Sequence, residues 1–176
     1  SPTAQPGIWT RDGVELDLLG PEAVAGPGRR GARLGPHGKT AARKVKGLEG
    51  ALVESTPMEL TALDGDDRRF EVRVARPAAL LVSKLHKIGE REGQGDRLAD
   101  KDALDVLRLL QGVSTQDLAA SVERLQVNET SADVTRQALD LLRRLFGRLE
   151  GTGTKMVTRA TEGLADPAIM GASCRV

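Results

Sequence analysis

The stretch "KLHKIGEREGQGDRLADKDALDVLRLL", residues 84–110, holds two amphipathic patterns joined by a polar, glycine-containing connection. Leu81, Leu85 and Ile88 recur at the spacing of one helical face, which predicts a helix over residues 77–91. The order of elements around this stretch, strand-like before it and helical after it, decides the expected fold.

Charged side chains interrupt both apolar patterns. Lys84 falls on the apolar stripe of the first predicted helix, with Arg91 about two turns further along the same face. A second helix is predicted over residues 99–111 and carries Asp102 and Asp105 near its start. Two interpretations of Lys84 remain open. Either its stem packs on apolar neighbours while the ammonium reaches water, or the ammonium enters a cleft where an anion compensates its lost hydration.

The two aspartates also have two interpretations. Acidic side chains are favoured in the first turn of a helix, and Lys101 and Arg108 lie at the spacing of ordinary helix-surface ion pairs with Asp105. Asp102 and Asp105 nevertheless follow the helix of Lys84 after one short connection. This pairing of the two motifs favours a functional interpretation of the aspartates.

Strand-like patterns dominate the N-terminal part of the chain. Asp12-Gly13 is a tight-turn signal inside the run 7–19, which predicts a hairpin. The other predicted elements are a loop, mobile in the free chain, over 20–39, a short basic helix over 40–49, strands over 51–55, 58–63 and 69–75, and helices over 114–125 and 131–150.

Because strands come first and helices follow, the predicted fold class is α+β, with a small antiparallel or mixed sheet before a C-terminal helical bundle. The expected divisions are a partial sheet over residues 1–76 with a basic insert at 20–48, a helical domain over 77–150, and a loose tail over 151–176. The tail is expected to add little to the core because its sequence is rich in Gly and Thr and weakly patterned.

Composition limits the function classes. The chain has 176 residues, a net charge of +1 and only 2% aromatic residues, so its core must rely on Leu, Val and Ala. Few aromatic rings argue against a base-stacking surface for single-stranded nucleic acid. A single cysteine and the lack of an apolar run of about 20 residues suggest a cytoplasmic protein.

The basic insert is a candidate for binding a partner. Between residues 23 and 48 there are basic residues and no acidic ones, and an RNA or protein acceptor is expected to contact residues 29–46. The basic residues are Arg29, Arg30, Arg33, Lys39, Arg43, Lys44 and Lys46.

Asp17 is the candidate metal ligand. It lies in "VELDLL", where alternation places it with Glu15 on one face of a strand. This face is either the solvated side of an edge strand or a position from which a carboxylate helps to hold Mg²⁺.

The succession "GVELDLL", a basic Gly-rich insert, "VARPAALLVSKLHKIGER" and "KDALDVLRLL" resembles the nucleotidyltransferase-fold proteins of the AbiEii abortive-infection toxin type over about residues 8–112. The resemblance implies that Lys84 and Arg91 contact nucleotide phosphates. It matches Asp102 and Asp105 to the family's last motif, and Asp17 to the carboxylate that completes the Mg²⁺ site. The catalytic residues implied are Asp17, Lys84 and Asp102.

The family's Gly-Ser and Asp-x-Asp motifs have no counterpart in the 16 residues before Asp17. The chain is therefore expected either to be a truncated form or to be a degenerate member, and to be inactive alone. In the complete protein, the resemblance implies transfer of NMP from an NTP to an RNA or protein acceptor, within a toxin–antitoxin system that includes a cognate antitoxin. The alternatives are a non-catalytic RNA- or protein-binding module and a helical interaction domain.

Overall fold

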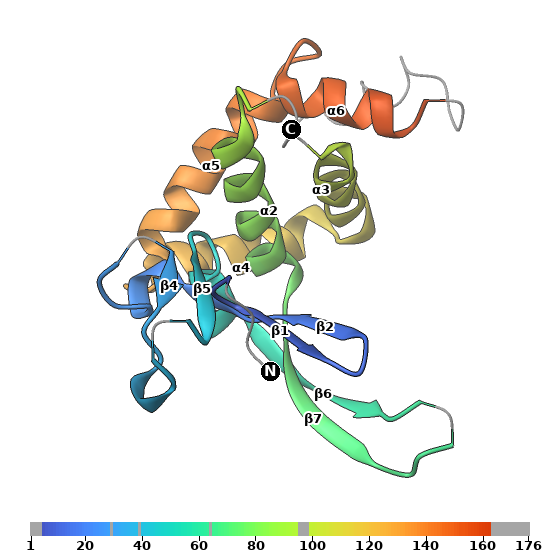
Figure 1. Ribbon diagram of the computed structural model, residues 1–176. Helices are drawn as coiled ribbons and strands as arrows, with labels where there is room; N and C mark the ends of the chain where they lie inside the picture. Colours follow the sequence, from blue (N-terminus) through green and yellow to red (C-terminus); the bar gives the residue numbers. More distant parts are fainter. Residues whose placement is uncertain (1–4, 29, 39, 64, 95–98, 163–176) are drawn as a thin grey trace.

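The fold is α+β, with small sheets in the N-terminal part and a bundle of helices after them, which confirms the predicted fold class (Figure 1). The computed structural model describes residues 5–28, 30–38, 40–63, 65–94 and 99–162. The strands are β1 (Ile8–Arg11), β2 (Val14–Asp17), β3 (Leu19–Pro21), β4 (Gly31–Ala32), β5 (Ala42–Val45), β6 (Ser55–Thr61) and β7 (Arg69–Ala75). The helices are α1 (Glu49–Val53), α2 (Pro77–Arg91), α3 (Asp100–Gly112), α4 (Thr115–Val127), α5 (Ala132–Phe146) and α6 (Thr152–Ala160), with 3-10 turns η1 (Glu22–Val24) and η2 (Gly35–His37).

The predicted N-terminal hairpin is confirmed. Strands β1 and β2 pair antiparallel with Ile8 opposite Asp17 and Arg11 opposite Val14. The turn places Asp12 at φ 50° and Gly13 at φ 78°, the left-handed values that a two-residue hairpin turn requires and that Asp-Gly tolerates best.

The basic insert is folded, which corrects the predicted loop over 20–39. Strands β3 and β4 both flank β5, β3 in parallel and β4 antiparallel, so the sheet order is β3-β5-β4. Ala25, Ala32 and Ala42 form a small buried cluster under these strands. The Nζ of Lys44 also donates hydrogen bonds to the carbonyls of Gly26 and Gly28. Alanine-sized packing produces no strong hydrophobic periodicity, so the sequence pattern missed this sheet.

Two further predictions are wrong in the next segment. Residues 42–45 of the predicted basic helix form the strand β5, and residues 51–53 of a predicted strand belong to α1. Glu49 explains the helix start, because its buried carboxylate accepts hydrogen bonds from the backbone N–H of Gly47 at 2.8 Å and of Ala23 at 3.0 Å. This carboxylate therefore attaches the insert to the first turn of α1.

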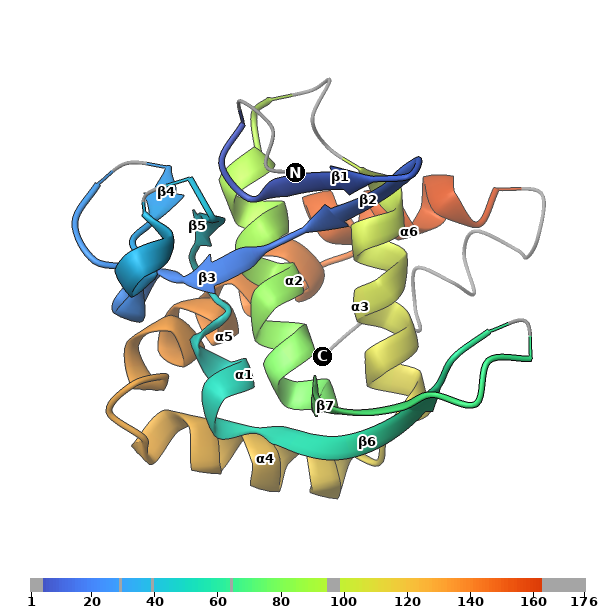
Figure 2. The ribbon, with the colours of Figure 1, turned by 60° about the horizontal axis from the view of Figure 1, so that its bottom comes forward.

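Strands β6 and β7 form a separate two-stranded ribbon whose far end projects beyond the helices (Figures 1 and 2). Helix α2 begins directly after it at Pro77, the position where proline is best tolerated in a helix. Helices α2 to α5 confirm the helices predicted from the 3.6-residue period, with ends shifted by a few residues.

Helix α2 lies at the centre of the bundle and contacts α1, α3, α4 and α5. Leu, Val and Ala supply most of the core, as the composition predicts, and Phe146 is its largest side chain. The fully buried members include Leu85, Ile88, Val106, Leu107, Leu125, Leu145, Phe146, Met156 and Val157.

The predicted loose tail is wrong for residues 152–160, which form α6 and pack on α3 and α5. Met156 is 1% exposed, and Gly153 lies so close to the ring of Phe146 that a Cβ there would meet it at 2.5 Å. The buried Thr154 hydroxyl donates to the Arg148 carbonyl before α6, and the buried Thr161 hydroxyl donates to the Val157 carbonyl within α6. Because their hydroxyls are hydrogen-bonded, these threonines can be buried. The buried face of α6 therefore has a polar sequence, which the apolar pattern did not reveal. The rest of the predicted tail, residues 163–176, lies outside the described residues.

Met156→Ala is expected to lower the free energy of unfolding by about 2–5 kcal/mol, the range for removing a large buried apolar side chain. Urea denaturation followed by circular dichroism measures the change. The neighbouring substitution Lys155→Ala is the control, because its exposed ion pair with Glu150 contributes at most about 1 kcal/mol. Equal effects of the two substitutions would contradict a structural role for α6.

Candidate functional site

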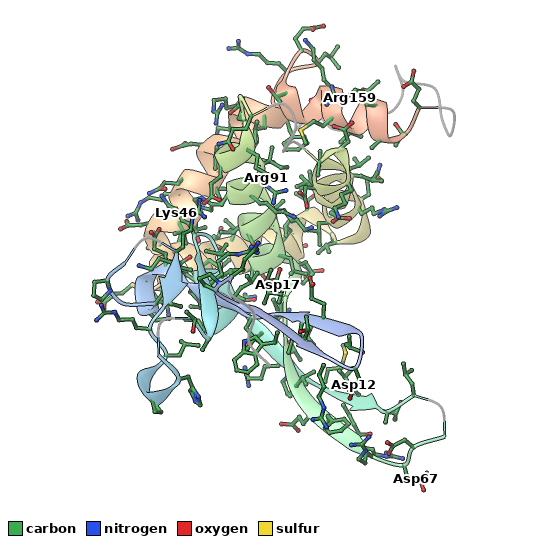
Figure 3. All side chains as sticks on the ribbon, viewed as in Figure 1. Asp12, Asp17, Lys46, Asp67, Arg91 and Arg159 are labelled. Carbon is green, nitrogen blue, oxygen red and sulfur yellow. The ribbon has the colours of Figure 1, made fainter. Side chains whose placement is uncertain are left out.

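A cleft of about 560 Å³ lies between the N-terminal sheets and α2. Three of the residues predicted from the sequence, Asp17, Lys84 and Arg91, line it together; Asp17 and Arg91 are labelled in Figure 3. The complete lining is Asp17, Leu19, Arg43, Lys44, Val45, Leu48, Ser83, Lys84, Lys87, Glu90 and Arg91.

The remaining predicted residues, Asp102 and Asp105 on α3, contact the cations of α2. The Nζ of Lys84 donates to Asp102 Oδ1 at 3.1 Å and to Asp105 Oδ2 at 2.7 Å. Lys87 donates to the same Asp102 oxygen at 2.8 Å, and Arg91 Nη1 lies 3.5 Å from Asp102 Oδ2. The two helices therefore share a charged cluster.

The contacts decide between the interpretations left open by the sequence. Asp102 is 1% exposed, so it is not a solvated residue at a helix start. The side chain of Lys84 keeps 28% of its exposure but directs its ammonium to two carboxylates of α3. The lysine on the apolar stripe is therefore explained first by the charge it neutralises on the neighbouring helix.

Sequence reasoning missed Lys87, although its spacing carried the signal. Residues 84, 87 and 91 recur every three to four positions and therefore project from one side of α2. Lys87 makes the shorter of the two lysine bonds to Asp102 and lines the cleft as well. A search for basic residues at helical spacing around Lys84 would have found it.

The network keeps its charges at neutral pH. Burial by itself raises the pKa of the Asp102 carboxyl, but hydrogen bonds and charge from Lys87 and Lys84 outweigh it, so the pKa lies below its ordinary value. Burial likewise disfavours the charged form of Lys84. Its hydrogen bonds to Asp105 and Asp102 more than reverse this, and its pKa is raised.

Two cations on the opposite wall come from β5 in the basic insert. Arg43 Nη2 lies 3.3 Å from Asp17 Oδ2, in an ion pair in which both side chains are about half exposed. The ammonium of Lys44 donates hydrogen bonds to the carbonyls of Gly26 and Gly28. The sequence indicated a basic insert but did not place these residues opposite α2.

The described residues do not fit the expected Mg²⁺ site. Asp17 pairs with Arg43, and within the described ranges no group of three or more His, Cys, Asp or Glu side chains is arranged to hold a metal ion. Mg²⁺ prefers several oxygen ligands in octahedral geometry, which Asp17 alone does not supply. The chemistry assigned to this cleft therefore rests on its side chains only.

No protein-family model matches the chain, and no curated protein or solved structure matches it either. The resemblance carried by the sequence motifs therefore stays a hypothesis. Within the described ranges, no helix combines the length and apolar character that crossing a bilayer requires.

Asp102→Asn is expected to lower the free energy of unfolding at pH 7 by about 3 kcal/mol, because the variant leaves the cations of α2 facing a neutral amide. The folded-state pKa of Asp102 lies below that of the unfolded chain. Its stabilising contribution is thus fully present above the unfolded value of about 4 and is lost as pH falls through the folded value.

The difference between wild type and Asp102→Asn should accordingly shrink as the pH is lowered from about 7 to about 3, measured by urea denaturation. Asp140→Asn is the matched control, since Asp140 forms an exposed pair with Arg143 and should change stability little at any pH. A pH-independent difference for Asp102→Asn would contradict the charge network.

Proposed function

We propose that this chain binds a nucleoside triphosphate in the cleft between β5 and α2, as part of a nucleotidyltransferase-like protein. The observation that carries the proposal is the charge of the lining. Arg43 and Lys44 line one wall and Lys84, Lys87 and Arg91 line the other, and among the described residues only Asp17 and Glu90 are acidic lining residues.

The cations of α2 keep hydrogen-bonding capacity for a ligand. A lysine ammonium has three donors and an arginine guanidinium has five. Lys84 uses donors on Asp102 and Asp105, and Lys87 uses one on Asp102. The unused donors are available to phosphate oxygens, while the buried carboxylate keeps the side chains in place. A phosphate held by several such donors gains charge-assisted hydrogen bonds.

The roles differ among the residues. Lys84, Lys87 and Arg91 contact the phosphates, and Asp102 and Asp105 position these cations without touching the ligand. Transfer of NMP to an RNA or protein acceptor is proposed only for a complete protein that supplies the metal-binding carboxylates missing from the described residues. That part of the proposal rests on the family resemblance alone.

A second candidate, a non-catalytic module for RNA or a protein partner, is favoured by the exposure of Arg30 and Arg33 on the insert. Both lie on the same folded segment that carries Arg43 into the cleft. Arg29 and Lys39 of the predicted acceptor surface lie outside the described residues. Binding of single-stranded RNA with a steep salt dependence and no competition by NTP would favour this candidate.

Calorimetric titration with ATP, GTP, CTP and UTP, with and without Mg²⁺, is expected to detect binding of at least one of them. Lys87→Met should weaken this binding about ten- to a hundred-fold, because it removes one charge-assisted contact of roughly 1.5–3 kcal/mol. The fold should tolerate the change, since Asp102 keeps Lys84 and Arg91 as partners.

The matched control is Lys155→Met, which removes the same charge from α6, a helix that contributes no residue to the cleft. It should leave the affinity unchanged. No binding of any of the four nucleotides, or equal affinities for wild type and Lys87→Met, would contradict the nucleotide cleft.

The purified chain is expected to transfer no NMP from α-labelled NTP to itself, to total RNA or to added protein in the presence of Mg²⁺. The physical reason is that Asp17, paired with Arg43, cannot hold the metal alone. Labelling that survives Asp17→Asn would show that the chemistry takes place at a different site. Labelling that Asp17→Asn abolishes would show that the carboxylate set is complete after all.

A further inference from the structure

The β6–β7 ribbon has one apolar face that the rest of the described chain leaves partly exposed. Its cross-strand pairs on this face are Thr56 with Val74, Met58 with Val72, and Leu60 with Phe70. Met58, Leu60, Phe70, Val72 and Val74 are between 36% and 50% exposed. A two-stranded ribbon is marginal by itself, and a sheet of three or more strands with an apolar face is stable. The ribbon therefore has the partly exposed apolar face and the low strand number of an incomplete sheet.

The two edges of the ribbon differ. Arg76 N–H donates to Glu54 O at 2.9 Å and Ala62 N–H to Arg68 O at 2.9 Å, which places the even-numbered residues in the hydrogen-bonded pairs. The backbone groups of the odd-numbered residues point outward. Pro57 is one of them on β6, so that edge lacks a donor near its middle, as protected edge strands often do.

The outer edge of β7 has no such interruption. Arg69, Glu71, Arg73 and Ala75 direct their N–H and C=O groups outward, and none of them pairs with other backbone in the described part of the chain. Their side chains lie on the polar face, in the order basic, acidic, basic. The edge is therefore an open template for another strand whose charges match.

We propose that β7 pairs antiparallel with β7 of a second copy of this chain, with the twofold axis at Val72, to form a continuous four-stranded sheet. In this register, Glu71 lies opposite Arg73 of the second copy, and Arg73 lies opposite its Glu71. Opposite charges directly across a strand pair are favourable, and like charges are unfavourable. Centring the axis on Glu71 instead places Glu71 opposite itself and Arg69 opposite Arg73, which charge repulsion opposes.

The same register joins the two apolar faces. Val72 meets Val72 of the second copy, and Phe70 meets its Val74, because directly opposed residues lie on one face of the sheet. All residues of β7, from Arg69 to Ala75, find a partner, since Val72 is the middle residue of the strand. The contact is isologous and closes as a dimer, so the blocked β6 edges become the outer strands.

Cysteine cross-linking in the full chain tests the register. In a Cys174→Ser background, Val72→Cys is expected to form a disulfide with itself under mild oxidation. Residues opposed in a non-hydrogen-bonded pair have Cα atoms about 4.5 Å apart, within the disulfide range. Phe70→Cys and Val74→Cys should each cross-link poorly alone and efficiently when the two proteins are mixed. Met58→Cys, on the same face of β6, is the control and should not cross-link, because β6 lies away from the proposed interface.

Charge reversal tests the association itself by analytical ultracentrifugation. Glu71→Arg should raise the dimer dissociation constant on the order of tenfold or more, since it turns both symmetry-related pairs repulsive. It should not weaken the ribbon, because it also removes the repulsion between Glu71 and Glu59, which face each other within the hairpin. Adding Arg73→Glu should restore association.

Glu123→Arg makes the same charge change at an exposed position of α4 and should leave the dimer intact. Glu71→Pro should abolish the dimer, because it deletes an outward N–H of β7. A monomer at all concentrations up to about 1 mM, a dimer insensitive to both Glu71 substitutions, or self-cross-linking of Phe70→Cys in preference to Val72→Cys would each overturn the proposal.

Discussion

Asp102 is almost fully removed from water, and a buried carboxylate stays ionised only when cations or donors lie within reach. Helix α2 supplies Lys84, Lys87 and Arg91 for this purpose, all from one side of the helix. These ion pairs favour a rotation of α2 that directs the three cations to α3, while its apolar face with Leu85 and Ile88 stays in the core. Because the same side of α2 lines the cleft, the charge balance of the core also determines the character of the candidate site.

Two other buried carboxylates attach the N-terminal part to the helices in the same way. Glu54 accepts from Arg124 Nε at 2.6 Å and lies 3.6 Å from Arg76 Nε, linking the start of the ribbon to α4 and to the start of α2. The hydrogen bond from Arg124 is the main reason that the pKa of Glu54 lies below its ordinary value. Glu49 holds the insert to α1 through backbone N–H groups. Specific polar links thus attach the β3-β5-β4 sheet and the β6–β7 ribbon to the helices, although neither is paired with the other in the described part of the chain.

The sequence predicted the elements whose signal is local or periodic, such as the Asp12-Gly13 turn and the helices with a 3.6-residue apolar period. It failed where burial depends on small or hydroxyl side chains, namely the alanines under β3-β5-β4 and the threonines of α6. For the site, helical spacing and charge identified Lys84, Arg91, Asp102 and Asp105 as candidates from the sequence alone. Arg43 was expected only in the acceptor-binding insert and not in the cleft, because its position opposite α2 depends on a sheet that the sequence pattern did not reveal.

A ligand phosphate and the carboxylates of α3 both attract the cations of α2, so the geometry decides whether they compete. Asp102 is buried, whereas the side chains of Lys87 and Arg91 keep about a third of their exposure and line the cleft. The carboxylate therefore holds each cation from the core side and leaves the cleft side open. Cations fixed in this way lose less conformational freedom when an anion binds than free surface lysines do, which makes binding tighter for the same contacts. If the cleft binds a phosphate as proposed, the ion network that stabilises the helix pair would also preorganise the cleft for it.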